Sequence, residues 1–453
     1  MSLTNGSDSL GHNDKSKKHA LVVPFLAQRS HIDGIYRLAL QLARRGVTVS
    51  FVTLASDVPT RKDDKELEGL DFKFLPYNES LTLPFIRSVD DLKEFIVASF
   101  VHLQPILQDL KGKQDAPTCL VYDLFCSWGT EVSKELNIPR FPFFCSGAVF
   151  ARFVQESPRL FSHEGPFVIK EDGSAELFDG TFTIPGLTPM TGPELLEQLF
   201  KQPQWPIALG HSIAEADGLI INTAYELESP QIEEIKRQYT QQAAASGRKE
   251  TELFLVGPIA SFKDRFPAEP ESDSPRPESL QWLDSQPFQS VLYISLGSWG
   301  RWNPDQVHEL AVALEAAGQR FLWVLPNTYE ALPAGFEQKM RESGEGLIAT
   351  GWVPQLQILK HASPMNCRYA VDVLKIGVQV GHMAWEGPSL VKSEEFERAF
   401  KFLLVDYEGK TMISSVYELM LELQDAVAEG GSSCKALDDL VQTIPGQYAC
   451  ISS

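Results

Sequence analysis

Basic residues are scarce in this chain. Its 453 residues include 40 Lys and Arg against 60 Asp and Glu, for a formal net charge of −20. A surface of that sign repels nucleic acids and anionic membranes unless a local basic patch overrides it, and the sequence contains no basic run. We therefore expect no nucleic-acid partner.

Long apolar runs are also missing. No stretch approaches the roughly 20 apolar residues that a membrane-spanning helix needs. Residues 1–18 are polar and lack the apolar segment of a signal peptide, which is typical of a disordered tail. These absences predict a cytoplasmic protein without membrane insertion.

Cysteine is rare, and its spacing carries no pattern. The six cysteines form no CxxC pair and have no histidine at zinc-finger spacing. In a cytoplasmic chain such residues are by default free thiols that pack in the core. We therefore predict no disulfide framework and no metal site.

The chain also lacks the GxGxxG fingerprint, which argues against a dinucleotide-dependent reductase. What it does contain is two segments of the form strand, amphipathic helix, strand. The first runs from an apolar strand at 20–25 to a second at 47–54, and the second runs from 290–296 to 320–325. Each segment is typical of the start of a Rossmann-like domain, so the expected fold class is α/β.

Further strands predicted at 118–122, 140–144, 218–222 and 253–256 extend the first segment into a parallel sheet. Residues 260–278 are rich in Pro, Ser and charge, as linkers are. The predicted organisation is a tail at 1–18, an N-terminal domain at 19–259, a linker at 260–278 and a C-terminal domain at 279–453. Two doubly wound domains joined in this way bind ligands between the carboxyl ends of their sheets.

Several stretches resemble, in the same order, the landmarks of the plant family-1 UDP-glycosyltransferases. They include 23–28, 121–125, 221–228, 256–259, 282–287, 290–298, and Gly351-Trp352-Val353-Pro354-Gln355 with the residues up to Ser363. The resemblance covers nearly the whole chain from residue 19. It implies a GT-B fold, an N-terminal acceptor domain and a C-terminal domain that binds a UDP-sugar.

The resemblance breaks after Ser363, where Pro364-Met365-Asn366 follows. In the family, the signature continues through a strand, a helix with a ribose-binding Glu, a second strand and an acidic-Gln pair that holds the sugar. By this comparison roughly thirty residues are absent, and the C-terminal domain is predicted to lack about two strands and a helix. Strand 290–296 would then become an edge, and 377–380 would be the last strand.

The family's reaction is an inverting glycosyl transfer, for which a histidine suits the role of base. The resemblance implies His31 as that base and Asp123 as its orienting partner. Arg29 and Ser30 both separate Gln28 from His31, whereas the family usually has one residue there. The alternative is a solvated histidine at a helix start and an aspartate that caps a turn.

On the donor side, the resemblance implies stacking of Trp352 on uracil, with Val353 and Gln355 beside the nucleoside and Gly297 and Ser298 near the diphosphate. The alternatives are a core tryptophan and an ordinary tight turn. On the acceptor side, aromatic residues are candidates that could equally belong to the core. They are Phe143, Phe144 and Trp205, and also Phe150.

The resulting functional prediction is transfer of a sugar, most simply glucose, from a UDP-sugar co-substrate to a small phenolic or flavonoid-like acceptor, with no bound cofactor. Whether this chain is an active enzyme stays open, because the donor signature is incomplete. The alternative is a catalytically inactive homologue or shortened isoform that binds a small aromatic ligand or a partner enzyme.

Overall fold

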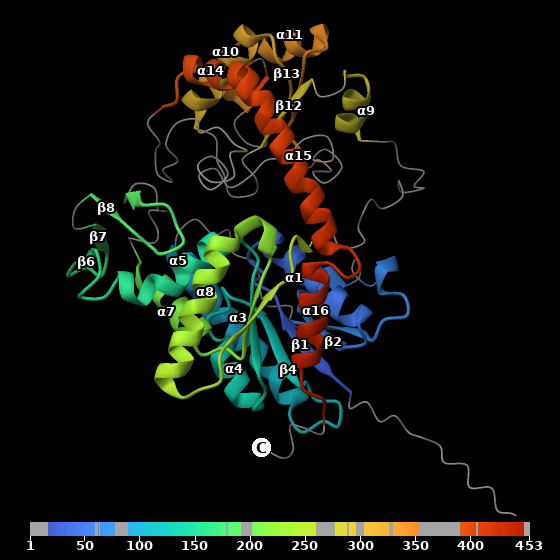
Figure 1. Ribbon diagram of the computed structural model, residues 1–453. Coiled ribbons are helices and arrows are strands. Elements are labelled where there is room, and N and C mark those ends of the chain that lie inside the picture. Colours follow the sequence, from blue (N-terminus) through green and yellow to red (C-terminus); the bar gives the residue numbers. More distant parts are fainter. Residues whose placement is uncertain are drawn as a thin grey trace, which may run out of the picture.

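A computed structural model describes residues 17–58, 62, 64–77, 89–177, 180–191, 202–259, 277–287, 290–295, 303–325, 329–351, 353, 390–404 and 406–447. Two bodies built on parallel sheets account for most of these residues (Figure 1). Most of the predicted linker and the predicted strand 377–380 lie outside the described residues.

The N-terminal body is built on a seven-stranded sheet in the order β11-β10-β5-β4-β1-β2-β3, in which every pairing is parallel. The strands are β1 (His19–Val23), β2 (Thr48–Thr53), β3 (Phe72–Pro76), β4 (Cys119–Asp123), β5 (Arg140–Phe144), β10 (Gly218–Ile221) and β11 (Glu252–Leu255). This is the doubly wound order, and six of the seven strands correspond to predicted ones.

Both faces of this sheet are covered, as the continuous apolar character of its strands requires. In β1, Ala20 and Val22 belong to one core cluster, whereas Leu21 and Val23 belong to another. Helix α1 (Arg29–Arg44) and the C-terminal helix α16 (Ser432–Thr443) cover the first face. The other face is covered by α3 (Val89–Leu110), α4 (Gly129–Leu136), α5 (Ala148–Leu160), α7 (Gln204–Ala214) and α8 (Tyr225–Ser246).

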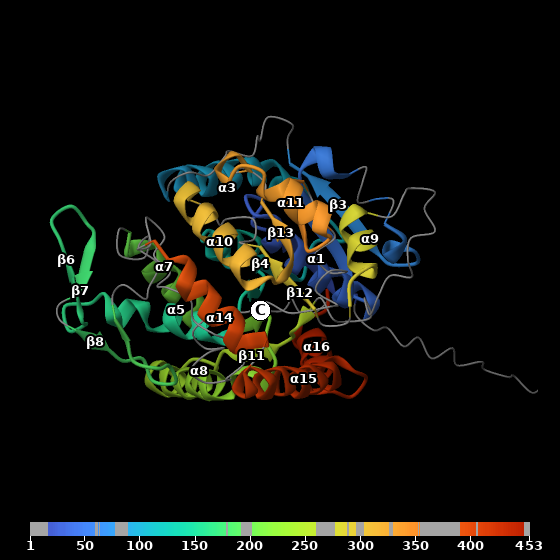
Figure 2. The ribbon, with the colours of Figure 1, turned by 90° about the horizontal axis from the view of Figure 1, so that it is seen from above.

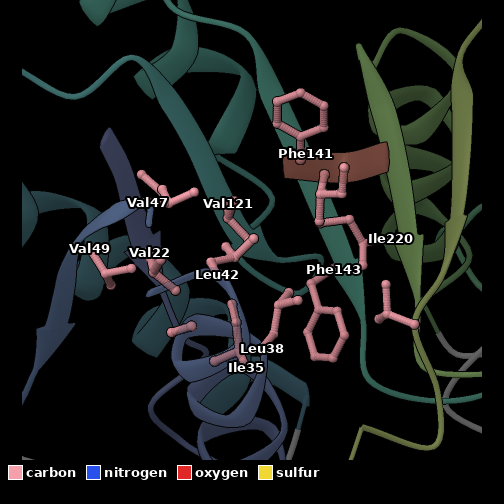
Figure 3. Close-up of a cluster of buried hydrophobic side chains, with 14 of the residues drawn as sticks. Val22, Ile35, Leu38, Leu42, Val47, Val49, Val121, Phe141, Phe143 and Ile220 are labelled. Carbon is pink, nitrogen blue, oxygen red and sulfur yellow. The ribbon is translucent and has the colours of Figure 1, made fainter. Parts of the chain in front are cut away.

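Helix α1 is positioned by one apolar stripe. Ile35, Leu38 and Leu42 recur at spacings of three and four residues, and all three are completely buried against the sheet. Figure 3 shows them beside Val22 of β1 and Val121 of β4. The first turn of α1 is thereby fixed beside the carboxyl ends of these two strands.

The C-terminal body has a three-stranded parallel sheet in the order β12-β13-β14, formed by β12 (Val291–Ile294), β13 (Arg320–Val324) and β14 (Gly346–Ala349). Within the described residues β12 pairs with β13 alone, and its four residues are half-buried, whereas Phe321, Leu322 and Trp323 of β13 are fully buried. Among the described strands β12 is therefore an edge.

Helix α10 (Pro304–Ala317) shows why the second predicted helix forms where it does. The Asn303 side chain accepts a hydrogen bond from the Asp305 amide at 2.9 Å, Pro304 occupies the first turn, and Gly318 ends the helix with φ of 57°. Among the described residues, the other helices of this body are α9 (Glu278–Asp284), α11 (Phe336–Ser343) and α14 (Ser393–Leu404).

Short elements complete the described structure. Two antiparallel hairpins are formed by β6 (Phe167–Ile169) with β7 (Ala175–Leu177) and by β8 (Thr181–Phe182) with β9 (Met190–Thr191). Single turns of 3-10 helix occupy Ala55–Asp57, Lys65–Leu67 and Tyr329–Ala331. None of the described helices is both long and apolar enough to cross a bilayer.

The chain returns to the N-terminal body at its C-terminal end. Helix α15 (Tyr407–Val427) runs from the C-terminal body toward the N-terminal one and passes beside α8 (Figures 1 and 2). Helix α16 then buries Leu437 and Leu440 in the same core cluster as α1, and Arg45 forms an ion pair with Asp438 at 2.7 Å. The placement of all of 279–453 in the C-terminal domain did not anticipate this packing.

We predict that Leu437→Ala destabilises the N-terminal body. The side chain is fully buried against α1 and the sheet, so the substitution removes apolar contacts and leaves a cavity. The expected loss in free energy of unfolding is about 2–5 kcal/mol, measured by urea denaturation. The matched control is Leu421→Ala on α15, where the side chain is 42% exposed, and the expected change is within about 0.5 kcal/mol. Equal effects of the two substitutions would contradict this packing.

Candidate active site

Three adjacent strands deliver polar side chains to the same edge of the N-terminal sheet. Asp123 is the last residue of β4, Cys145 directly follows β5, and His31 lies in the first turn of α1, which follows β1. Because β1, β4 and β5 are parallel neighbours, their carboxyl ends meet. The ligand atoms of the three side chains all lie within 4.8 Å of one another.

His31 and Asp123 form a direct hydrogen bond, as their predicted proximity requires. The His31 Nδ1 atom lies 2.8 Å from Asp123 Oδ2. The other carboxylate oxygen, Oδ1, accepts a hydrogen bond from the Phe125 amide at 3.0 Å, so the carboxylate is fixed at both ends. With Nδ1 donating to Asp123, the second ring nitrogen of His31, Nε2, keeps its lone pair in the neutral imidazole.

The loop that is one residue longer than usual does not displace His31. Gln28 serves as the N-cap of α1, and Arg29 and Ser30 are its first two helical residues. The additional residue is therefore part of the helix, and the imidazole projects from the first turn toward β4.

Cys145 packs against the His31 ring. Its sulfur lies 3.4 Å from Nδ1 and 3.5 Å from Nε2. A sulfur atom at nearly equal distances from both nitrogens cannot lie in the ring plane, since it would overlap the carbon between them. The thiol therefore contacts the face of the ring rather than forming an in-line hydrogen bond.

Aromatic rings enclose the imidazole. Phe125 lies 4.6 Å and Phe25 5.5 Å from the ring centre of His31, and Trp205 packs edge-on against Phe125 at 4.8 Å. Only 13% of the His31 side chain and 1% of the Asp123 side chain are exposed. The pair therefore interacts in a medium from which water is largely excluded.

Burial and charge act on His31 in opposite directions. Burial lowers the pKa of His31, but the neighbouring Asp123 carboxylate, with smaller contributions from Cys145, outweighs burial and raises this pKa to about 10. Burial also raises the pKa of the Cys145 thiol, which keeps the sulfur protonated.

A buried carboxylate on α8 holds the segment that follows Cys145. Glu228 accepts hydrogen bonds from the amides of Ala148 and Val149, at 2.5 and 3.1 Å, and so satisfies the free N–H groups at the start of α5. A Cβ atom on Gly147 would lie 2.6 Å from both oxygens of this carboxylate, so the close approach requires glycine. The Asn222 side chain donates to the Cys145 carbonyl at 3.1 Å. These contacts fix Cys145 beside His31.

The remaining predicted site residues lie in different surroundings. Phe143 and Phe144 are 0% and 2% exposed in the core clusters of the sheet, so these two acceptor candidates are in fact core residues. Their strand is covered on both faces, which leaves these side chains no open surface. Trp205 contacts Phe125, which in turn lies against the His31 ring. Val353 packs against Leu280, Leu322 and Leu347, whereas Gly297, Ser298, Trp352 and Gln355 lie outside the described residues.

Comparison with known proteins finds similar glucosyltransferases but no matching family model. No protein-family model matches the chain. The abscisate β-glucosyltransferase of Phaseolus angularis is 31% identical over 409 residues, covering 77% of this chain and 82% of that protein. The anthocyanin 3'-O-β-glucosyltransferase of Gentiana triflora is 27% identical, covering 93% of this chain and 97% of that protein.

A solved structure is similar over the same span. UGT73P12 of Glycyrrhiza uralensis, complexed with glycyrrhetinic acid 3-O-monoglucuronide, superimposes with a TM-score of 0.75 and is 26% identical. The match covers 95% of this chain and 96% of that one. The similarity therefore extends over both bodies of the fold.

We predict that His31 titrates well above the ordinary histidine value of 6.5 and that Asp123→Asn lowers its pKa, because the carboxylate that stabilises the imidazolium is lost. Proton NMR of the histidine ring during a pH titration measures both. His19 is an internal control, since burial lowers its pKa below 6.5.

The raised pKa of His31 also makes the stability of the fold depend on pH. The folded-state pKa of His31 exceeds 6.5, so the pair stabilises the fold fully below about pH 6.5 and loses this contribution as pH rises through about 10. If His31 had the same pKa in the unmodified chain and in Asp123→Asn, the proposed coupling between the two side chains would be contradicted.

Proposed function

Because the chain belongs to the plant family-1 UDP-glycosyltransferases, we propose that His31 and Asp123 serve an inverting transfer of glucose from UDP-glucose to a hydroxyl group of a small phenolic acceptor. The single observation that carries the proposal is the 2.8 Å contact between His31 Nδ1 and Asp123 Oδ2 at the carboxyl edge of the sheet. It fixes the tautomer in which Nε2 can accept a proton.

In molecules whose His31 ring is neutral, a fraction that grows as pH rises toward about 10, Nε2 takes the proton of the acceptor hydroxyl as the oxygen attacks the anomeric carbon of glucose. The bond between that carbon and the UDP oxygen breaks, and UDP leaves with the electron pair. The Asp123 carboxylate stabilises the imidazolium that forms, and the dry surroundings strengthen that interaction.

The aromatic residues around His31 support a phenolic acceptor. Phe25, Phe125 and Trp205 offer ring faces and edges close to the base, where an aromatic acceptor could pack. The Nε1 atom of Trp205 is buried and has no hydrogen-bond partner among the described residues. The glucosyltransferases of Phaseolus angularis and Gentiana triflora are named for small acceptors, abscisate and anthocyanin.

On the donor side we propose that the break after Ser363 weakens UDP-sugar binding. Contacts to phosphate and ribose are charge-assisted, at about 1.5–3 kcal/mol each, so losing three or four removes roughly 5–10 kcal/mol. A ligand of micromolar to millimolar affinity has only about 4–8 kcal/mol of binding free energy. The half-buried edge strand β12 is compatible with a C-terminal domain that lacks its neighbouring strands.

The same break favours a second candidate function. A homologue that binds a small aromatic molecule, or that pairs with an active enzyme, needs the acceptor domain and not the donor site. An assay of UDP-glucose turnover with a broad panel of phenolic acceptors separates the two candidates, because only the first forms a glucoside and releases an equal amount of UDP.

We predict that titration of the full chain with UDP or UDP-glucose gives no saturable heat at millimolar ligand, because the lost contacts exceed the binding free energy of such a ligand. Isothermal calorimetry measures this directly. Clear micromolar binding would mean that other residues replace the missing half of the donor site.

Any residual transfer should depend on the proposed base. His31→Ala is expected to lower the rate by about 10²–10⁴-fold, the usual contribution of general-base catalysis. Asp123→Asn should also lower it, since an amide N–H facing Nδ1 favours the tautomer that is protonated at Nε2. Mass-spectrometric detection of the glucoside provides the sensitivity, and unchanged rates in both variants would remove His31 from the reaction.

A further inference from the structure

Asn222 directly follows β10 and lies in the loop that leads into α8. We propose that this residue positions His31 and ties the orientation of its ring to the segment that leaves the N-terminal body after β11. It acts through Cys145, whose sulfur packs against the ring. The inference rests on the proposed function only in treating His31 as the base.

The Asn222 side chain forms two hydrogen bonds to segments that are far apart in sequence. Its Nδ2 group donates to the carbonyl of Cys145 at 3.1 Å. Its Oδ1 atom accepts from the amide of Ile259 at 2.8 Å. Because a backbone carbonyl only accepts and a backbone amide only donates, the two partners fix the orientation of the side-chain amide. A single side chain therefore bridges the segment after β5 and the segment after β11.

The loop that carries Asn222 is fixed by its own contacts. The Thr223 carbonyl accepts a hydrogen bond from the Gly257 amide at 2.8 Å, and the Thr223 hydroxyl donates to the buried Glu228 carboxylate. A Cβ atom on Gly257 would lie 2.4 Å from the Thr223 nitrogen, so the two segments approach too closely for a side chain at that position. The segment after β11 is therefore seated directly on this loop.

The chain that returns from the C-terminal body is attached at the same place. The hydroxyl of Ser433, a fully buried residue at the start of α16, donates to the Gly257 carbonyl at 2.6 Å. The adjacent Ser432 donates to the Glu226 carboxylate at the start of α8, at 2.8 Å. Both connections between the two bodies thus bear on the loop that holds Cys145, and a shift of either one would act on Asn222.

The contact between Cys145 and the face of the His31 ring carries this coupling to the base. The hydrogen bond from Nδ1 to Asp123 holds one corner of the ring, but a single hydrogen bond tolerates a tilt of the ring about that corner. The sulfur, at 3.4 and 3.5 Å from the two ring nitrogens, restricts this tilt. Since Asn222 holds the Cys145 backbone, its loss would let the sulfur and the ring move together.

The test measures the surroundings of His31 and Cys145 in the full chain. Asn222→Ala is expected to shift the His31 Hε1 resonance in proton NMR, which is assigned by its absence in His31→Ala. It should also raise the rate at which iodoacetamide alkylates Cys145, resolved by peptide mass spectrometry, about three- to tenfold, as the loss of one hydrogen bond that holds a segment closed predicts.

Two further variants separate the parts of the network. Asn222→Asp keeps the acceptor for the Ile259 amide but loses the donor to Cys145, so it should show the same changes even if Asn222→Ala does not fold. Ser433→Ala removes the hydrogen bond to Gly257 and leaves Asn222 in place. It should give smaller changes of both readouts, because it loosens only the connecting segment.

The matched control is Leu107→Ala in the last turn of α3, which removes a fully buried side chain from the same body and should leave both readouts unchanged. If the Asn222 variants left His31 and Cys145 unchanged, or if the control changed them as much, the inference would be overturned. Unchanged readouts in Ser433→Ala would overturn the link to the connecting segment. Neither readout needs UDP-glucose, so a chain that transfers no glucose still gives a decisive result.

Discussion

The parallel pairing of β1, β4 and β5 is the constraint on which the candidate site depends. It brings three carboxyl ends to one edge, where His31 meets two side chains from much further along the chain. The hydrogen bond between His31 and Asp123 spans 92 positions in sequence, and the contact between His31 and Cys145 spans 114. Neither would exist without the buried strands beneath them, which are packed on both faces.

The same logic explains which features the sequence could predict. Strands such as 118–122 stand out because continuous apolar runs are typical of buried parallel strands, and residues after such strands share an edge. β3 and β14 escaped this reading; in β3, Lys73 interrupts the apolar run. Cys145 directly follows a predicted strand, and this position could have placed it at the same sheet edge as Asp123. The spacing between cysteines, which was the pattern considered, carries no such information.

Other features depend on tertiary contacts that no local pattern encodes. The buried faces of Phe143 and Phe144 follow from helices on both sides of β5, and the docking of α16 follows from the apolar face of Leu437 and Leu440 meeting α1. The inclusion of Arg29 and Ser30 in the first turn of α1 likewise depends on how the buried apolar stripe of this helix packs. In each case the packing partner lies far away in sequence. The periodicity of apolar residues therefore predicts which face is buried but not which element covers it.

The central proposal is that the acceptor side of this chain is built and that a loss of residues after Ser363 limits the donor side. The most direct measurement is UDP-glucose turnover by a chimera in which the residues proposed to be absent after Ser363, roughly thirty, are supplied from the Phaseolus angularis relative. The account predicts glucoside formation on a phenolic acceptor by the chimera, far above the unmodified chain, and its loss in the chimera that carries His31→Ala. A folded chimera that binds UDP-glucose and transfers nothing, or one whose rate is unaffected by His31→Ala, would contradict the account.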